Sequence, residues 1–303
     1  MTSKYRRNLQ KISKRLTTHQ LRRLPEKDLE LGYNNLFMRD EKQPVSPYFL
    51  GYYSPAGIHY ALESYGFFET LHKIGYENLD LIVDTQDPYR QRIAIYYDQK
   101  DPEHLLGEVV VKKNHITPYP PFPSLIYGRN FEVISIEWLC MQNPLANFTP
   151  DKPRLPGQKY PGLGMGAMIM EILVIMCGRL RTAGLLNVPE HFHNAQMYSG
   201  QFMFLNPDEE ARRIAIARDL LGQCTLSQAS WAIDFGCVSE NDKAFEWHGS
   251  EQIIVLDRDL KEYIHGTEYK KRVAEQTKKF HYVLDHSKWA QKASEIEDAP
   301  GCP

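Results

Sequence analysis

The feature of this sequence that most constrains its fold is a glycine-rich segment that leads directly into an apolar stretch. Glycine occupies every second position from Gly162 to Gly166, and the residues from Ala167 to Met176 are apolar except for Glu171. Glycine allows a ligand to approach the backbone closely, and the free N–H groups and the dipole at a helix start attract anions. The segment therefore predicts a loop that opens a helix and binds phosphate or pyrophosphate, although a tight turn that only packs a helix on a sheet has the same pattern.

The sequence around this segment alternates between patterns typical of strands and of helices. The near-continuous apolar run over residues 131–141 indicates a central strand that is buried on both faces. The order of the elements predicts an α/β fold. The remaining patterns predict a hairpin of strands at 78–84 and 91–97, strands at 105–113, 185–188 and 253–256, and helices at 56–74, 166–182, 208–221 and 257–289.

Composition and charge argue against several classes of protein. Of the 303 residues, 42% are hydrophobic and 24% are charged, and the net charge is −2, so a surface built for nucleic acid is not expected. The longest apolar run, residues 165–177, is too short to span a membrane and contains Glu171. The five cysteines include no Cys-x-x-Cys pair, which predicts reduced thiols, a cytoplasmic location, and neither disulfides nor a zinc site.

The first 25 residues carry positive charge without any acidic residue. Leu9, Ile12 and Leu16 recur at helical spacing, which predicts a basic amphipathic helix. Such a helix is either a solvated surface helix or a docking surface for an acidic partner, such as a carrier protein or RNA, and an organellar transit peptide is a third interpretation. Its basic residues are Lys4, Arg6, Arg7, Lys11, Lys14, Arg15, Arg22 and Arg23.

The glycine segment and the order of elements resemble the GNAT acyltransferase superfamily. The signature of that family is Arg or Gln, then Gly-x-Gly-x-Gly or Ala, at the start of a long helix after the fourth strand. This chain matches the pattern from Gly162 to Ala167, with Pro161 at the Arg or Gln position. Residues 139–144 are similar to the end of the family's fourth strand, which closes with a proline. His191, Asn194 and Tyr198 are similar in spacing to the helix that lines the cofactor.

The resemblance covers about residues 56–205. It implies an α/β (α+β) GNAT-like fold, in which a mixed and mostly antiparallel sheet has helices on both faces. Three regions are then expected: a basic helical N-terminal arm at 1–55, the GNAT-like core at 56–205, and a mainly helical C-terminal extension at 206–303.

The resemblance also implies a co-substrate and the residues that hold it. The co-substrate is acetyl-CoA or another acyl-CoA, and no metal is expected. Leu139 and Met141 lie on the strand that pairs with the pantetheine arm, and Asn194 lines the cofactor. Pro161 has no N–H, so one potential donor is absent. The pyrophosphate is assigned to the loop residues Gly162, Leu163, Gly164, Met165, Gly166 and Ala167.

Transfer of an acyl group to an amine needs a base, and the sequence offers two kinds of candidate. Glu137 lies between Ile136 and Trp138, where partial desolvation would raise its pKa, although a strand glutamate that faces solvent or pairs with arginine fits the sequence equally well. His191 or His193 is an alternative base or a substrate contact.

Each of two further side chains near the expected site can be interpreted either as functional or as purely structural. By the resemblance, Tyr198 supplies the proton or hydrogen bond that the departing thiolate needs, but it is equally well explained as a half-buried tyrosine with its hydroxyl at the rim. Cys140 lies on the central strand, and we interpret it as an inert thiol.

The expected function is that of an N-acyltransferase that uses an acyl-CoA, first of all acetyl-CoA, and transfers the acyl group directly to the amine of a small molecule or a protein. One alternative is an enzyme that takes its acyl group from an acyl-carrier protein, as the resembling autoinducer synthases do, with the basic N-terminal helix as the docking surface. The other alternative is a GNAT-like scaffold without catalytic activity that binds a partner.

Overall fold

A computed structural model describes residues 3–23 and 46–296 of the chain, with side chains from Arg6 onward. By their internal contacts these residues divide into two compact units. The first unit consists of Met1–Lys113, Ser135–Pro144 and Gly162–Leu180. The second consists of Asn114–Ile134, Leu145–Pro161 and Arg181–Pro303. Cys302 lies outside the described residues, and the four described cysteines form no disulfide with one another.

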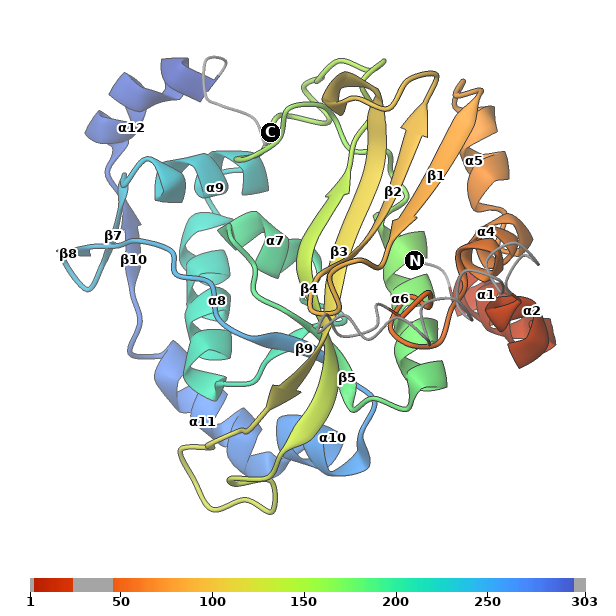
Figure 1. Cartoon of the computed structure of the whole chain (residues 1–303). Helices are drawn as coiled ribbons and strands as arrows, with labels where there is room; N and C mark the ends of the chain where they lie inside the picture. Colours follow the sequence, from red (N-terminus) through yellow and green to blue (C-terminus); the bar gives the residue numbers. More distant parts are fainter. Residues whose placement is uncertain (1–2, 24–45, 297–303) are drawn as a thin grey trace. The chain divides into compact units, whose positions relative to one another are not determined.

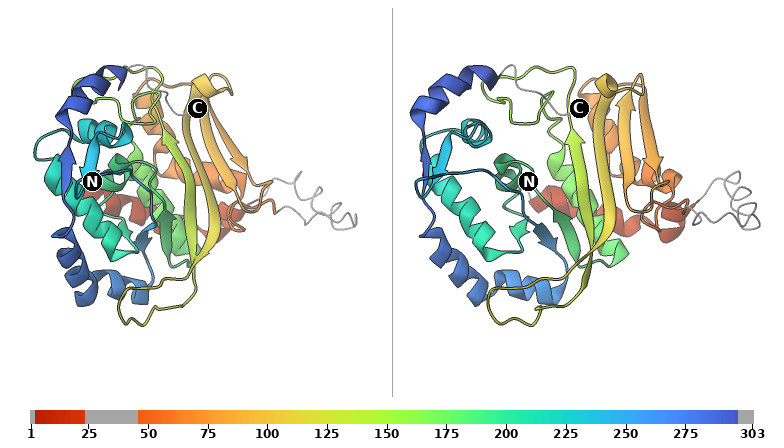
Figure 2. Two further views of the ribbon diagram at one scale, coloured as in Figure 1. Left: turned by 90° about the vertical axis from the view of Figure 1, so that its left-hand side faces the viewer. Right: turned by 60° about the vertical axis from the view of Figure 1, so that its left-hand side comes forward.

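The first unit is built on strands that lie in the order β1, β2, β3 and β4, and the pairs β1–β2 and β2–β3 are antiparallel. The predicted hairpin is confirmed, with Leu79 opposite Tyr97, and β2 pairs with β3 so that Ile93 faces Val109. The three strands run side by side in both views of Figure 2. Their bounds are β1 (Leu79–Asp84), β2 (Gln91–Tyr97), β3 (Leu105–Ile116) and β4 (Phe131–Met141), and the first residues of β4 and the last of β3 belong to the second unit.

The helices of the first unit lie against this sheet and against one another. The prediction of a single helix at 56–74 is wrong, because Gly66 adopts a left-handed conformation (φ 76°) that ends one helix and begins the next. The first of the two helices starts at Pro55, where the side chain of Ser54 accepts a hydrogen bond from the N–H of Gly57. The helices are α1 (Ser3–Arg15), α2 (Thr18–Arg22), α4 (Pro55–Ser64), α5 (Phe67–Lys73) and α6 (Gly166–Leu180) (Figure 1).

The predicted basic N-terminal helix is confirmed as α1, and it packs on α6. Leu9 is buried, and the carboxylate of Glu171, which the sequence showed as the one charge in an apolar helix, accepts hydrogen bonds from Arg6 at 2.7 Å and from Gln10 at 3.0 Å. Arg179 of α6 donates to the carbonyl of Leu16 at 3.0 Å, beyond the end of α1. The charged group in the apolar helix is thus the anchor of the N-terminal helix.

The second unit contains an antiparallel sheet in the order β5, β9 and β6, which confirms the strands predicted near residues 185 and 253. The N–H of Ala183, next to β5, donates to the carbonyl of Glu132 in the first part of β4 at 2.7 Å. A second sheet has the order β10, β7 and β8. The bounds are β5 (Gly184–Asn187), β6 (Met203–Phe204), β7 (Val238–Glu240), β8 (Lys243–Ala244), β9 (Gln252–Val255) and β10 (Tyr282–Leu284).

Helices make up much of the rest of the second unit. The prediction of one helix at 257–289 is wrong: Gly266 separates two helices, and β10 interrupts the helical stretch because it pairs with β7. The helices predicted at 166–182 and 208–221 are confirmed as α6 and α8. The helices of this unit are α7 (Phe192–Met197), α8 (Pro207–Leu220), α9 (Leu226–Asp234), α10 (Arg258–His265), α11 (Thr267–Thr277) and α12 (His286–Lys292), and short 3-10 helices cover Pro102–His104 in the first unit and Ala293–Ile296 here.

The fold class is therefore mixed α/β with mostly antiparallel strands, as the sequence predicted at this coarse level. Within residues 3–23 and 46–296, every helix falls short of the length and apolar character that a membrane span requires.

Candidate functional site

The glycine loop alternates between exposed glycines and buried apolar side chains. Gly162 and Gly164 are exposed, whereas Leu163 and Met165 are 9% and 4% exposed and anchor the loop in the first unit. Gly164 has a φ of 74°, which favours glycine, and the space where its Cβ would be has no atom within 4 Å. The backbone of this loop is thus open to the approach of a ligand.

Helix α6 begins at the last glycine of the loop. The N–H groups of Met168 and Ile169 both donate to the carbonyl of Met165, at 2.9 and 3.1 Å. The N–H groups of Gly166 and Ala167 come earlier in the turn, where a helix has no internal acceptors to offer. They lie at the positive end of the helix dipole. A phosphate-type anion therefore fits the chemistry of this loop.

The loop is fixed beside the end of β4. Gln142 and Gly162 form an isolated antiparallel bridge, and Gln142 donates through its N–H to Leu106 and through its side chain to Leu105, both at 2.9 Å. The carbonyl oxygen of Met141 lies 3.6 Å from the position of a Cβ on Gly162. The end of β4 and the glycine loop thus form one continuous surface in the first unit.

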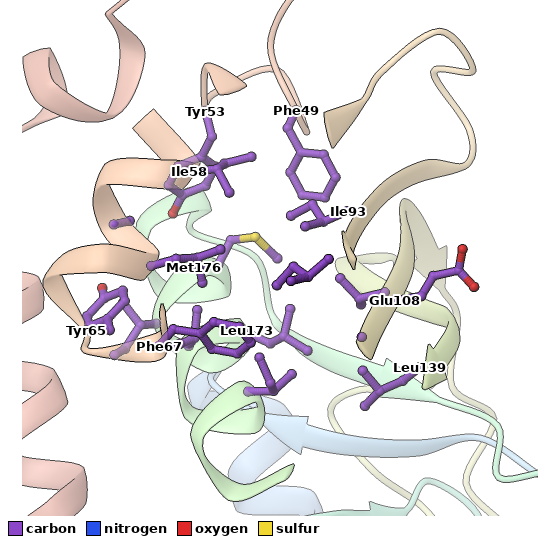
Figure 3. A pocket seen from close by; sticks show the side chains of 18 of the residues that line it. Phe49, Tyr53, Ile58, Tyr65, Phe67, Ile93, Glu108, Leu139, Leu173 and Met176 are labelled. Atoms are coloured by element: carbon purple, nitrogen blue, oxygen red, sulfur yellow. The ribbon is translucent and has the colours of Figure 1, made fainter. Parts of the chain in front are cut away.

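An apolar cavity of about 90 Å³ lies in the first unit beneath the same two elements. Figure 3 shows Leu139 of β4 and Leu173 and Met176 of α6 among the side chains that surround it. Met141 also lines the cavity, and its sulfur lies 2.8 Å from where a Cβ on Gly107 would be. The strands β2 and β3 supply Ile93, Ile95, Gly107 and Val109, and helices α4 and α5 and the segment before them supply Phe49, Tyr53, Ile58, Leu62, Tyr65 and Phe67.

The polar groups at the cavity wall are engaged elsewhere or uncharged. The carboxylate of Glu108 is bonded to Arg92, and in Figure 3 it points away from the labelled apolar side chains. Arg179 donates to the carbonyl groups of Ser13 and Leu16. Burial raises the pKa of Tyr53, so its hydroxyl stays protonated. The cavity therefore presents an almost purely apolar surface.

Glu137 does not occupy the desolvated position that the sequence suggested. It is an exposed residue of β4, and its carboxylate pairs with Lys112 Nζ at 3.0 Å. This environment corresponds to the alternative in which the glutamate faces solvent or pairs with a cation, except that the cation is a lysine and not an arginine. Its role as a base stays a prediction.

His191 has an acidic partner in the second unit. Its Nδ1 lies 3.1 Å from Asp234 Oδ1, at the end of α9. The ring of His193 stacks on that of His191 with 5.4 Å between centroids. Burial, with a smaller contribution from His191, lowers the pKa of His193 to about 3, so this ring is neutral. His191 therefore combines a carboxylate partner with a neutral neighbour.

The two remaining predicted residues lie on or beside helix α7 of the second unit. Tyr198 follows the last residue of this short helix, and burial raises the pKa of its hydroxyl. The N–H of Asn194 donates to the carbonyl of His191 at 3.1 Å, within the first turn. The phenol of Tyr198 is therefore protonated at neutral pH.

The structure brings part of the predicted site together within one unit. Glu137, Leu139, Met141 and the loop from Gly162 to Ala167 all belong to the first unit, whereas His191, Asn194 and Tyr198 belong to the second. Sequence reasoning missed the apolar cavity and the partner of His191. The cavity has a weak signal, namely Gly107 among the apolar residues of β3, but Asp234 lies 43 residues from His191 and has none.

Among the described residues, no group of three or more His, Cys, Asp or Glu side chains is arranged to hold a metal ion. Comparison of the sequence with models of known protein families gives no match, and comparison with curated proteins gives none either. The resemblance to the GNAT superfamily therefore rests on the residues of the glycine loop and its neighbours alone.

Proposed function

We propose that this protein is an N-acyltransferase of the GNAT type that binds an acyl-CoA and transfers its acyl group directly to an amine. One observation carries the proposal. The glycine loop at the start of α6 is bridged to the end of β4, and Met141 of that strand faces the loop with its carbonyl and the apolar cavity with its side chain. An anion site next to an apolar chamber suits a ligand with a pyrophosphate at one end and an acyl group at the other.

The loop would bind the pyrophosphate through backbone donors. The N–H groups of Gly166 and Ala167 supply two of them, reinforced by the helix dipole. Leu163 and Met165 fix the loop through their buried side chains, so the donors need little rearrangement when the ligand arrives. Pro161 lacks an N–H, and the proposal assigns the anion to the residues after it.

In the reaction, the amine nitrogen forms a bond to the thioester carbon, and the carbon–sulfur bond breaks. The amine must lose one proton, and the thiolate must gain one. By the resemblance, Tyr198 is the group proposed to give the thiolate a proton or a hydrogen bond, and its raised pKa favours the hydrogen bond. The two candidate bases are Glu137, in the first unit, and His191, in the second, and both stay proposals. Asp234 lies within hydrogen-bond distance of Nδ1 of His191 and can orient the imidazole, whereas the carboxylate of Glu137 is paired with Lys112.

The acyl donor could also arrive on a carrier protein, and the surface of α1 favours this second candidate. Lys11, Lys14 and Arg15 are exposed on this helix, while Arg6 is committed to Glu171 inside the unit. A row of exposed cations suits an acidic carrier protein. The proposed docking surface therefore consists of the exposed cations, without Arg6.

Calorimetric titration with coenzyme A tests the first proposal. We expect binding by the wild type and at least tenfold weaker binding by Gly164→Ala, because the added methyl group enters the open space above the loop. Gly51→Ala is the matched control: Gly51 is also exposed, has a φ of 70°, and has no atom within 4 Å of its Cβ position. Both substitutions carry a similar backbone penalty of about 1 kcal/mol, so only the ligand distinguishes them.

Three outcomes separate the candidates. No binding of coenzyme A at millimolar concentration contradicts the acyl-CoA proposal and favours the inactive scaffold. Equal weakening by both glycine variants contradicts the assignment of the loop. Replacement of Lys11, Lys14 and Arg15 by glutamine should impair transfer from a carrier protein and spare transfer from free acyl-CoA, and equal loss of both contradicts carrier docking.

A further inference from the structure

The cavity of the first unit carries information on the acyl group itself. Its volume is about 90 Å³. A cavity of about 150 Å³ lined by apolar side chains takes up benzene, which has six carbon atoms. By proportion, the space here accommodates about four carbon atoms. A methyl group would leave most of it empty, and a chain of ten or more carbons would not fit without displacing the wall.

The chemistry of the wall restricts the ligand further. The side chains around the cavity are aliphatic or aromatic, and Glu108 and Arg179 have their charged groups bonded elsewhere. A polar or charged ligand would lose its hydration there without gaining hydrogen bonds, which is unfavourable. An empty apolar space of this size is itself destabilising, because the lining atoms lose their contacts. A short hydrocarbon chain fills the empty space and has no polar groups to desolvate.

The position of the cavity connects it with the proposed co-substrate site. Leu139 and Met141 are alternate residues of β4, so both side chains lie on one face of the strand, and both line the cavity. The carbonyl of Met141 is next to Gly162. Its thioether lies over Gly107, which has no side chain, and methionine is flexible enough to move aside for a ligand. Met141 is therefore the adjustable part of the wall.

We propose that the acyl group is longer than acetyl, with a chain of about four carbons such as butyryl, and that it occupies this cavity between β4 and α6. The inference rests on the proposed use of an acyl-CoA, and it replaces the acetyl group that the family resemblance implied. Leu139, Leu173 and Met176 contact the chain and set its length. The chain is held by burial of apolar surface alone.

The test compares the dissociation constants of coenzyme A and of its acetyl, butyryl and decanoyl thioesters by calorimetry. Each buried methylene contributes about 0.8 kcal/mol, which is about fourfold in affinity. Butyryl-CoA has two methylenes more than acetyl-CoA, so we expect about fifteenfold tighter binding. Decanoyl-CoA should gain nothing beyond butyryl-CoA.

Variants of one buried leucine provide the control. Leu173→Ala enlarges the cavity and should move the preference toward longer acyl chains. Leu106→Ala truncates a leucine of β3 that is equally buried but does not line the cavity, and it should keep the preference for butyryl. Ile172 of α6 also lines the cavity. If Leu173→Ala fails to fold, Ile172→Phe serves instead, because the larger side chain fills the cavity and should remove the advantage of butyryl-CoA over acetyl-CoA.

The outcomes distinguish this inference from the proposal beneath it. Absence of binding by coenzyme A and by all its thioesters overturns both. Binding of coenzyme A with equal affinities for the acetyl and butyryl thioesters overturns the acyl-chain inference and leaves the acyl-CoA proposal standing. If Leu106→Ala and Leu173→Ala change the preference for butyryl-CoA to the same extent, the acyl chain does not lie in this cavity, and the inference is overturned.

Discussion

The ion pair between Arg6 and Glu171 fixes the N-terminal helix α1 to α6, the helix that the glycine loop opens. Glu171 is almost completely buried, with 2% of its side chain exposed, and it accepts hydrogen bonds from Arg6 and Gln10. Arg6 is the only one of the two charged groups in contact with solvent, with 47% of its side chain exposed. Replacement of Arg6 by methionine therefore leaves a buried carboxylate without its counter-charge.

The size of the effect follows from this geometry. Removal of one partner of a fully buried ion pair costs about 3 to 5 kcal/mol. Two features lower the value here: solvent screens the half-exposed guanidinium, and Gln10 continues to donate to the carboxylate. We predict that Arg6→Met lowers the free energy of unfolding by about 2 kcal/mol.

Urea denaturation of a double-mutant cycle measures this effect. The cycle uses Arg6→Met, Glu171→Gln and the double variant, and we expect a coupling energy of at least about 1 kcal/mol. Lys14→Met, on an exposed position of the same helix, is the control and should change the stability by less than about 0.5 kcal/mol. Strictly additive single substitutions would refute the reasoning, because they would show that the two side chains do not act as a pair.

Two further predictions concern the second unit. Because the pKa of His193 is lowered from 6.5 to about 3, the unfolded chain binds a proton in this range that the folded chain does not. The contribution of His193 to the free energy of unfolding is complete above pH 6.5 and decreases by about 2 kcal/mol between pH 6.5 and pH 5. Urea titrations of His193→Phe at these pH values should show that this part of the pH dependence is lost. A pH dependence equal to that of the wild type would contradict the prediction. Asp234→Asn tests His191 as a candidate base: in that role, loss of its partner should lower acyl transfer at least tenfold and leave the affinity for coenzyme A unchanged, as measured by initial rates and calorimetry. Full activity of this variant would exclude His191 and Asp234 as the base pair and leave Glu137 as the candidate.

The elements that the sequence predicted well are those with a strong local pattern. Strand β4 was predicted at residues 131–141 from its apolar run, and the hairpin of β1 and β2 from two strand-like runs on either side of a turn signal at residues 86–89. The helix predicted at 56–74 failed because its apolar spacing continues across Gly66, and only the left-handed backbone at that residue reveals the break. Strand β10 was missed because three residues that pair with a distant strand have no helical or strand pattern of their own.

The candidate site shows the same division between local and distant information. The glycine loop is local, and the sequence located it together with the helix that follows. The partners of Glu171 and His191 are side chains far along the chain, so no spacing could identify them. The cavity is lined by apolar residues that are indistinguishable in sequence from ordinary core residues. The predicted boundaries of the three regions at residues 55 and 205 stay a prediction.

The most direct test of the central claim is a titration of isotope-labelled protein with coenzyme A, followed by amide ¹H–¹⁵N spectra. The account predicts that the largest shifts occur at the amides from Leu163 to Ala167 at the start of α6, and that Gly164→Ala suppresses them. Shifts concentrated in another part of the chain, or none at millimolar coenzyme A, would contradict the account.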